Sequence, residues 1–226
     1  MGPLRPRRHV GRAAARVRLH TGALGRRQLA LLRRLGPFLD PGPFYLAGGT
    51  ALALHLGHRR SVDFDWFSER PLPDPLRLAT EIEASGVPLE VTGVDKGTLH
   101  ARSASVRVSF LEYRYPLLRP LVETRLSGVR LASLEDIAAM KLAAVAQRGS
   151  RKDFVDVFAL GGILGLDEML ALYRRKYDVR DVGHVLVALA YFDDAEDERM
   201  PAMLRRWSWV DVRRTIQRWV RQATIR

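Results

Sequence analysis

The 226-residue sequence has no cysteine, only four lysines, and no run of about 18 uncharged apolar residues. Without cysteine, disulfides, zinc–thiolate sites and cysteine nucleophiles are excluded, so any metal must be bound by oxygen or imidazole. No apolar stretch with a small-residue cleavage site follows the basic N-terminus, so we expect neither a membrane segment nor a signal peptide. These absences favour a cytoplasmic protein, and 47% apolar with 27% charged residues indicates a packed globule.

Acidic residues are absent before Asp40. The same stretch contains ten arginines, at positions 5, 7, 8, 12, 16, 18, 26, 27, 33 and 34. They account for most of the formal net charge of +12, because the other residues carry 27 basic and 25 acidic side chains. We interpret residues 1–22 as a flexible basic arm. Such an arm could grip a nucleic-acid backbone, or it could be the solvated tail of an arginine-rich chain.

Local patterns predict a mixed α+β front half over residues 23–130. Helices are expected at 28–35, 50–56 and 76–85, and strands at 44–47, 61–67, 87–94, 97–102 and 105–113. Gly36-Pro37 is expected to end the first of these helices. In the strand at 61–67, Val62, Phe64 and Trp66 alternate with polar residues, which predicts a half-buried strand.

The back half, residues 131–226, is predicted to be helical. Ser133 and Asp136 have the spacing of a capping box that opens a helix carrying Lys141, and Gly149 ends that helix. Further helices are expected at 151–160, 167–177, 179–191 and 209–224. The predicted fold is therefore α+β, a mixed sheet flanked by helices and followed by a C-terminal helical region.

Two motifs in the front half point to phosphate and metal chemistry. Gly48-Gly49-Thr50 lies between a predicted strand and a predicted helix, where glycines allow close approach of a ligand and free amides favour phosphate. Asp63 and Asp65 alternate on the next strand, so both carboxylates project from one face and could bind one hard divalent cation. Each motif alone is common, but their order and context make the pair specific.

The segment LAGGTALALHLGHRRSVDFDWF (46–67) resembles the opening motif of the AbiEii/AbiGii toxin family of nucleotidyltransferases, in the polymerase-beta-like superfamily. The segment 131–160 resembles later motifs of that family, and the resemblance covers roughly residues 42–165. It implies a nucleotidyltransferase fold and a toxin of a toxin–antitoxin or phage-defence pair. Such proteins transfer nucleotides from a nucleoside triphosphate (NTP), in several members to the 3′ end of tRNA, which blocks translation.

The resemblance also implies roles for individual residues. The catalytic residues it implies are Asp63, Asp65, Lys141 and Asp156, of which Asp63 and Asp65 bind Mg²⁺ or Mn²⁺. The NTP-binding residues are Gly48, Gly49, Thr50, Ser61 and Lys141. From their position just before the Asp-x-Asp strand, His58, Arg59 and Arg60 could contact phosphate or acceptor RNA, and Asp153 is a further candidate contact. Residues 131–226 would form a helical domain that completes the cleft, and a cognate antitoxin is an implied partner.

The sequence pattern itself partly supports the roles of Lys141, Asp153 and Asp156. Lys141 lies at the edge of an apolar helical stripe, from which it could neutralise a phosphate or merely bury its stem. Asp153 and Asp156 share one helical face and could pair with Lys141. Asp153 also fits an ordinary charge at a helix start, whereas Asp156, which we expect to position the acceptor or act as base, does not.

One position departs from the superfamily pattern. A third carboxylate commonly lies on a neighbouring strand, and Ser109 occupies the matching place here. Glu112 is close by but points to the opposite face in an unbroken strand. Three interpretations stay open: catalysis with two carboxylates and a base such as Asp156, a bulge that redirects Glu112, or loss of activity.

The sequence thus predicts a magnesium-dependent transferase that moves a nucleoside monophosphate from its NTP to an acceptor hydroxyl, most simply on tRNA. A first alternative is a catalytically silent binding module of the same fold held by a partner. A second alternative is a transferase that modifies a protein or a small molecule instead of RNA.

Overall fold

A computed structural model describes residues 19–40, 42–126 and 128–224. Its strands form one mixed seven-stranded sheet in the order β3-β4-β5-β2-β1-β7-β6. The strands are β1 (Tyr45–Leu46), β2 (Phe64–Ser68), β3 (Glu90–Asp95), β4 (Thr98–Ser103), β5 (Val106–Glu112), β6 (Val122–Glu123) and β7 (Arg130–Leu131). Strand β2 pairs parallel with β5 and antiparallel with β1, which places β2 at the centre of the sheet. The meander predicted for 87–113 is therefore confirmed as β3, β4 and β5.

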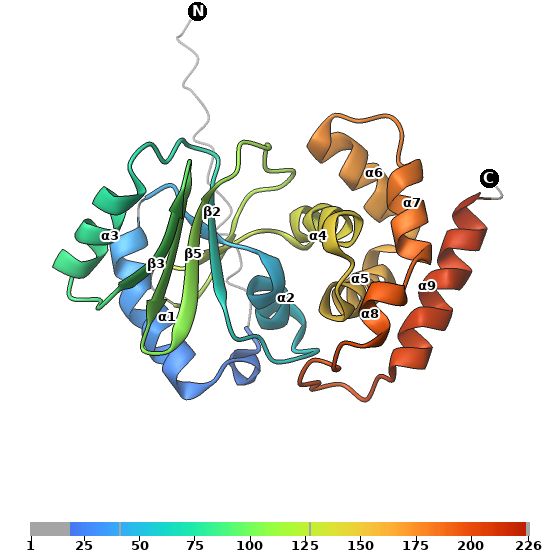
Figure 1. The fold of residues 1–226 in the computed structure, drawn as a ribbon, viewed down its shortest axis with the longest axis horizontal. Helices are drawn as coiled ribbons and strands as arrows, with labels where there is room; N and C mark the ends of the chain where they lie inside the picture. The colour runs from blue at the N-terminus through green and yellow to red at the C-terminus, as the bar shows by residue number, and fades with distance from the viewer. Residues whose placement is uncertain (1–18, 41, 127, 225–226) are drawn as a thin grey trace, which may run out of the picture.

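The helices divide into a group around the sheet and a group beside it. They are the 3₁₀ helix η1 (Thr21–Ala23), α1 (Arg26–Leu39), α2 (Gly48–Leu56), α3 (Pro75–Ala84), α4 (Leu134–Arg148), α5 (Arg151–Leu164), α6 (Leu166–Tyr177), α7 (Gly183–Ala190), α8 (Asp193–Glu196) and α9 (Trp209–Thr224). In Figure 1, α1 and α3 lie on one side of the sheet, and α2 and α4 lie between the sheet and the helices α5 to α9. This arrangement confirms the predicted α+β fold with a helical back half.

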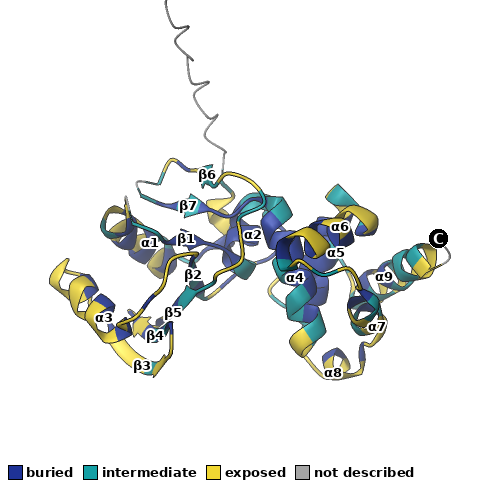
Figure 2. Ribbon diagram, turned by 90° about the horizontal axis from the view of Figure 1, so that it is seen from above, coloured by how far each residue is buried: buried dark blue, intermediate teal, exposed yellow. Residues whose placement is uncertain are grey.

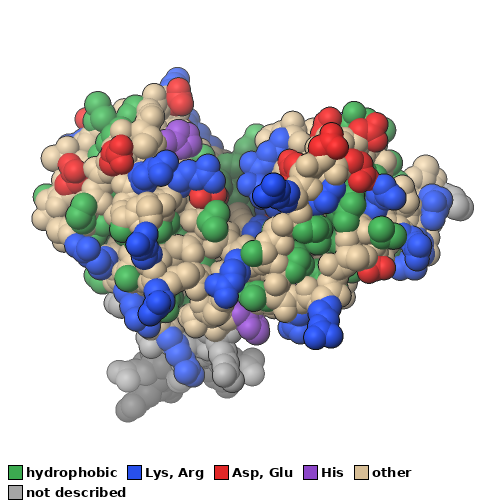
Figure 3. Space-filling model, turned by 60° about the horizontal axis from the view of Figure 1, so that its bottom comes forward, with side chains coloured by type: hydrophobic (Ala, Val, Ile, Leu, Met, Phe, Trp, Pro, Cys, Tyr) green, Lys and Arg blue, Asp and Glu red, His purple; other side chains and the backbone are tan. Residues whose placement is uncertain are grey.

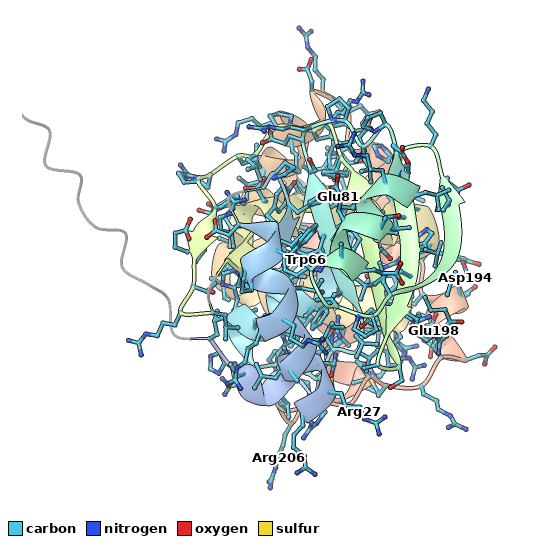
Figure 4. All side chains as sticks on the ribbon, turned by 90° about the vertical axis from the view of Figure 1, so that its left-hand side faces the viewer. Arg27, Trp66, Glu81, Asp194, Glu198 and Arg206 are labelled. Atoms are coloured by element: carbon cyan, nitrogen blue, oxygen red, sulfur yellow. The ribbon has the colours of Figure 1, made fainter. Side chains whose placement is uncertain are left out.

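One face of the sheet is closed by apolar packing. Phe64, Trp66 and Phe110 are fully buried on the face that α1 and α3 cover, and the labelled Trp66 lies inside the molecule behind these helices (Figure 4). Burying side chains of this size is the main favourable contribution to folding. Because strand residues alternate, Asp65 and Ser109 must project from the opposite face. The hydrophobic face therefore fixes which side of the sheet carries the polar residues.

Helices α2, α4 and α5 are the most buried helices of the molecule (Figure 2). Ser133 caps α4 as predicted, its hydroxyl accepting a hydrogen bond from the Asp136 amide at 2.9 Å. Gly149 follows α4 in the left-handed conformation, with φ of 54°, which glycine adopts without steric cost. These two residues set the ends of the helix that brings Lys141 to the sheet.

The structure corrects three local predictions. Helix α1 continues through Pro37 to Leu39, because Leu35 and Leu39 are both buried and their packing outweighs one lost backbone hydrogen bond. Strand β2 begins at Phe64, and Val62 is 63% exposed, so the alternation predicted from Ser61 breaks before the strand. Helix α7 begins at Gly183, later than predicted.

The predicted arm at 1–22 lies largely outside the described residues. Its last part is ordered, since the amide of His20 donates a hydrogen bond of 2.8 Å to the carbonyl of Leu54 and Thr21 begins η1. Among the described helices, none is long and apolar enough to cross a bilayer.

Candidate active site

The start of α2 is shaped by two glycines. Gly48 has φ of +64°, a conformation that a side chain disfavours, and a Cβ there would lie 3.3 Å from an Asp65 carboxylate oxygen. A Cβ on Gly49 would lie 2.5 Å from the Arg59 guanidinium. The N-cap residue Ala47 offers no side-chain hydrogen bond to the first turn. The two glycines therefore admit functional side chains and leave the helix start able to bind an anion.

Asp65 is the least satisfied carboxylate of the site. It lies in β2 against Gly48, and none of the described residues donates a hydrogen bond to it. Burial raises the pKa of Asp65, and the neighbouring charge of Asp63 raises it further. A desolvated carboxylate without a donor is suited to bind a cation.

Asp63 lies beside Asp65 but has a partner of its own. Both residues line one cavity of about 240 Å³ together with Gly49 and Thr50, although Asp63 precedes β2. The Asp63 carboxylate accepts two hydrogen bonds of 2.8 Å from the guanidinium of Arg107 on β5. Arg107 therefore competes with a cation for the Asp63 oxygens.

The pair of carboxylates fits a magnesium ion that also binds a substrate. Within the parts of the chain that the structure describes, no group of three or more His, Cys, Asp or Glu side chains could hold a metal. Mg²⁺ commonly takes one or two carboxylates and completes its octahedron with phosphate oxygens and water. Asp63 and Asp65 at the α2 start meet this requirement, with Asp65 the better prepared ligand.

Thr50 and Ser61 bind each other. The Thr50 hydroxyl donates to Ser61 Oγ at 2.7 Å or to the backbone carbonyl of Asp63, and both side chains are buried. Gln28 Nε2 donates to the Ser61 carbonyl at 2.7 Å. These contacts draw residues 61–63 against α2, which explains why β2 begins only at Phe64. The predicted NTP contacts of Thr50 and Ser61 stay a prediction beside this structural role.

Asp156 lies at the centre of a buried ionic network. Its carboxylate accepts hydrogen bonds from Arg59 Nε and Nη2, both at 2.7 Å, and from His58 Nε2 at 2.8 Å, and it lies 2.6 Å from Lys141 Nζ. Burial alone would raise the pKa of Asp156, but Lys141 and Arg59 hold it well below its usual range. A fully buried carboxylate in this state is a poor base, so we replace the expected base role with a positioning role.

Lys141 is held between two helices. Its ammonium lies 2.9 Å from Asp153 and 2.6 Å from Asp156, and the residue is 4% exposed. Burial alone would lower the pKa of Lys141, but these two carboxylates outweigh burial and raise it. Asp153 also accepts a 2.7 Å hydrogen bond from Arg148 Nε. Lys141, Arg148 and Arg59 thus share two carboxylates, and all three line the 240 Å³ cavity.

The segment 58–60 differs from its prediction. His58 and Arg59 were expected to contact phosphate or RNA, but they are 1% and 4% exposed and bind Asp156. The backbone of the segment is fixed from the C-terminal half, since the Arg60 amide donates to the Ala202 carbonyl at 2.7 Å. Only Arg60 is exposed, and it lines the 240 Å³ cavity with Asp63.

A larger cavity of about 630 Å³ opens on the other side of Asp65. Gly48, Asp65 and Lys141 line one end. The other end is an aromatic wall formed by Tyr113, Tyr115, Tyr173 and Tyr177. Tyr115 contacts the rings of Tyr113 and Tyr177, at centroid distances of 5.0 and 4.7 Å, and is 44% exposed. This wall was missed in the sequence, where the only local signal is the Tyr-Arg-Tyr triplet at 113–115.

The structure excludes one of the three interpretations of the missing third carboxylate, a bulge that redirects Glu112. Glu112 accepts a 2.8 Å hydrogen bond from the Leu72 amide and a second from Arg114 Nε. Strand β5 pairs with β2 in unbroken register from Val108 to Glu112, so no bulge redirects Glu112. Ser109 therefore takes the place opposite Asp65, and its Oγ lies 3.1 Å from Nδ1 of His100 on β4. His100 was not identified in the sequence.

Comparisons with known proteins agree with this geometry. Residues 30–215 match the family model described as nucleotidyl transferase AbiEii toxin, Type IV toxin–antitoxin system. An uncharacterized protein of Aquifex aeolicus (strain VF5) is 40% identical over 159 residues, which cover 69% of this chain and 76% of that protein.

Solved structures share the fold. MenT4, a nucleotidyltransferase toxin of Mycobacterium tuberculosis, superposes with a TM-score of 0.56 at 17% identity, covering 85% of this chain and 85% of that chain. JHP933 of Helicobacter pylori gives a TM-score of 0.53 at 17% identity, covering 89% of this chain and 95% of that chain. These superpositions confirm the predicted nucleotidyltransferase fold.

Proposed function

We propose that this chain, which belongs to the AbiEii family of nucleotidyl transferase toxins, transfers a nucleoside monophosphate from an NTP to a hydroxyl of an acceptor RNA with the help of Mg²⁺. Nucleotidyl transfer is the reaction of the family. The observation that carries the proposal is the position of Asp65. Its desolvated carboxylate, without a donor among the described residues, shares one cavity with the bare helix start at Gly48 and with Lys141.

We assign the metal to Asp65 and Asp63 and the phosphates to the start of α2. When bound, Mg²⁺, or Mn²⁺ in its place, neutralises phosphate charge and helps to orient the reacting groups. Asp65 is held ready by its packing against Gly48. The free amides at the start of α2 would bind the phosphates, while Lys141 offers its charge to the departing pyrophosphate.

The buried network sets the position of Lys141. A lysine with a four-carbon stem is flexible, but here its ammonium is fixed by Asp153 and Asp156 from α5. Arg59 and His58 fix Asp156 in turn. This arrangement lets a nearly fully buried cation face phosphate without moving, which is how a preorganised site stabilises a transition state.

The aromatic wall suits the nucleoside. A nucleobase gains by stacking on an exposed aromatic ring, and Tyr115 offers such a ring at the end of the cavity opposite Gly48. The wall is built from both halves of the chain, because Tyr113 belongs to the sheet side and its hydroxyl lies 2.5 Å from that of Tyr177 on α6. This contact supports the proposal that residues 131–226 complete the active-site cleft.

RNA is the acceptor that the charge distribution favours. Arg60, Arg148 and Lys152 line the 240 Å³ cavity beside the two aspartates. On the face in Figure 3, Lys and Arg side chains lie on both sides of the furrow between the two lobes. Such a surface attracts a phosphate backbone. The 3′ end of tRNA is single-stranded and would fit this cleft, so we propose a toxin of a toxin–antitoxin or phage-defence pair that blocks translation in the cytoplasm and is held by a cognate antitoxin.

The decisive experiment is transfer of label from each of the four NTPs to total tRNA in the presence of Mg²⁺. We expect labelled RNA with the wild type and none with Asp65→Ala. Asp95→Ala, on the exposed edge strand β3, is the matched control and should behave as the wild type. Labelling that persists unchanged in Asp65→Ala would refute the assigned site.

A further inference from the structure

Three neighbouring strands bring Asp65, Ser109 and His100 into one row. Asp65 on β2 is in register with Ser109 on β5, and Ser109 is in register with His100 on β4. Adjacent strands are separated by about 4.8 Å, so the three side chains follow one another across the sheet. The Oγ of Ser109 and Nδ1 of His100 lie 3.1 Å apart, within hydrogen-bonding distance.

This row faces the cleft. Asp65, Ser109 and His100 all line the 630 Å³ cavity together with Gly48 and Lys141. On β4 and β5, the residues that alternate with His100 and Ser109 are buried on the opposite face, as Leu99, Ala101, Val108 and Phe110 show. The pleat of the sheet therefore holds the serine and the histidine on the reactive side.

The row could supply the base that the proposed reaction requires. An acceptor hydroxyl must lose its proton as it attacks phosphorus, and the candidates weighed from the sequence cannot accept it. Asp156 is buried and paired with cations, and Glu112 is occupied by the Leu72 amide and Arg114. Ser109 lies in the next strand from Asp65, and the imidazole behind it is the base that serine alone lacks.

We propose that Ser109 and His100 form a proton relay for the acceptor hydroxyl, an inference that rests on the proposed function. Ser109 is the catalytic residue that contacts the acceptor, and His100 acts through it. In the relevant tautomer, the Ser109 hydroxyl donates to Nδ1 of His100, whose proton is on Nε2. The relay replaces the missing carboxylate by two side chains on two strands.

The relay gives a balanced step. The acceptor proton passes to Ser109 Oγ while the Ser109 proton passes to His100 Nδ1. The acceptor oxygen bonds to the α-phosphorus of the NTP, the bond from that phosphorus to the bridging oxygen breaks, and pyrophosphate leaves with the electron pair. The protonated His100 then returns its extra proton to solvent through Ser109, and the neutral pair is restored.

The test uses a substitution that should bypass His100. His100→Gln keeps a hydrogen-bonding group beside Ser109 but cannot accept the proton, so we expect kcat to fall about 100-fold while KM for the NTP stays within about twofold. Ser109→Asp supplies a carboxylate directly in the row. The double variant His100→Gln/Ser109→Asp should therefore recover most of the lost kcat.

The controls separate this inference from the proposed function. Thr98→Val lies on the same face of β4, two residues from His100, and should leave kcat unchanged. If the double variant is as slow as His100→Gln, or if His100→Gln is as fast as the wild type, the relay is overturned while transfer itself stands. If the wild type labels no acceptor, the proposed function fails, and the relay fails with it. Thermal unfolding of each variant identifies loss of fold.

Discussion

The cleft lies between a wall formed by the sheet and a wall formed by the C-terminal helices. The carboxylates of these two walls have opposite surroundings. On the helical wall, Asp156 and Asp153 are fully buried, yet each is bound by several cationic donors. On the sheet wall, Asp65 is desolvated and has no donor among the described residues. A buried charge without a partner costs free energy, so a cation bound at Asp65 would stabilise the sheet wall. The helical wall supplies rigidity, and the sheet wall supplies binding capacity.

The largest loss of stability is expected when the central carboxylate of the helical wall is removed. Asp156→Ala leaves Arg59 and Lys141 buried without their common partner, and we expect the free energy of unfolding to fall by about 3–5 kcal/mol. Urea denaturation monitored by circular dichroism measures this change. A loss below about 1 kcal/mol would show that water or a rearrangement compensates the two cations, contrary to the network described here.

On the sheet wall, removal of a carboxylate charge should stabilise the folded protein. Asp65→Asn should abolish label transfer but raise the melting temperature near pH 7, because the raised pKa of Asp65 means that its charge destabilises the folded state. For a raised pKa, the stabilising protonated form is lost as pH rises through that pKa. The gain from asparagine should therefore vanish at about pH 3, below the ordinary aspartate value.

Asp63→Asn is the matched control for this prediction. It relieves part of the repulsion on Asp65 but also removes the charged partner of Arg107, so it should raise the melting temperature less than Asp65→Asn does. Melting temperatures of both variants across the pH range decide the comparison. A fall in stability for Asp65→Asn at pH 7 would contradict the contrast between the two walls.

The aromatic wall of the 630 Å³ cavity is expected to contribute to NTP binding. Tyr115→Ala should weaken NTP binding about tenfold, since stacking on an aromatic ring contributes about 1–3 kcal/mol per base. Binding of inorganic tripolyphosphate should stay the same, because that anion lacks a base. Isothermal titration calorimetry measures both ligands. Tyr191→Ala, a comparably exposed tyrosine outside the cavity, is the control. Equal loss of both ligands in Tyr115→Ala would place the ring near the phosphates instead.

The smallest effect concerns the ion pair of Asp63. Arg107→Gln removes a partner that competes with Mg²⁺ for this carboxylate, so the Mg²⁺ concentration for half-maximal transfer should fall about two- to fivefold, as expected for a largely exposed pair. Arg102→Gln, at the register position opposite Arg107 on β4, is the control. An unchanged Mg²⁺ requirement in Arg107→Gln would show that Asp63 contributes little to the metal site.

Much of the site could be predicted from local patterns. The glycine pair before a helix, the two aspartates of the Asp-x-Asp motif and the capped helix of Lys141 depend on residues within a few positions of one another. Backbone periodicity then fixes where their side chains point. The same periodicity failed at Val62, because hydrogen bonds from Thr50 and Gln28 hold residues 61–63 outside the ladder.

By itself, the sequence determined the family and the fold class, and it predicted a phosphate-binding turn and a common face for the two aspartates. Only the tertiary structure decided that Asp156 is a buried anchor for His58, 98 residues away in the chain, and that Arg107 binds Asp63. It also placed His100 behind Ser109, since strand order and register bring β4, β5 and β2 together. The direction of a side chain follows from its own strand or helix, whereas its partner depends on how distant segments pair.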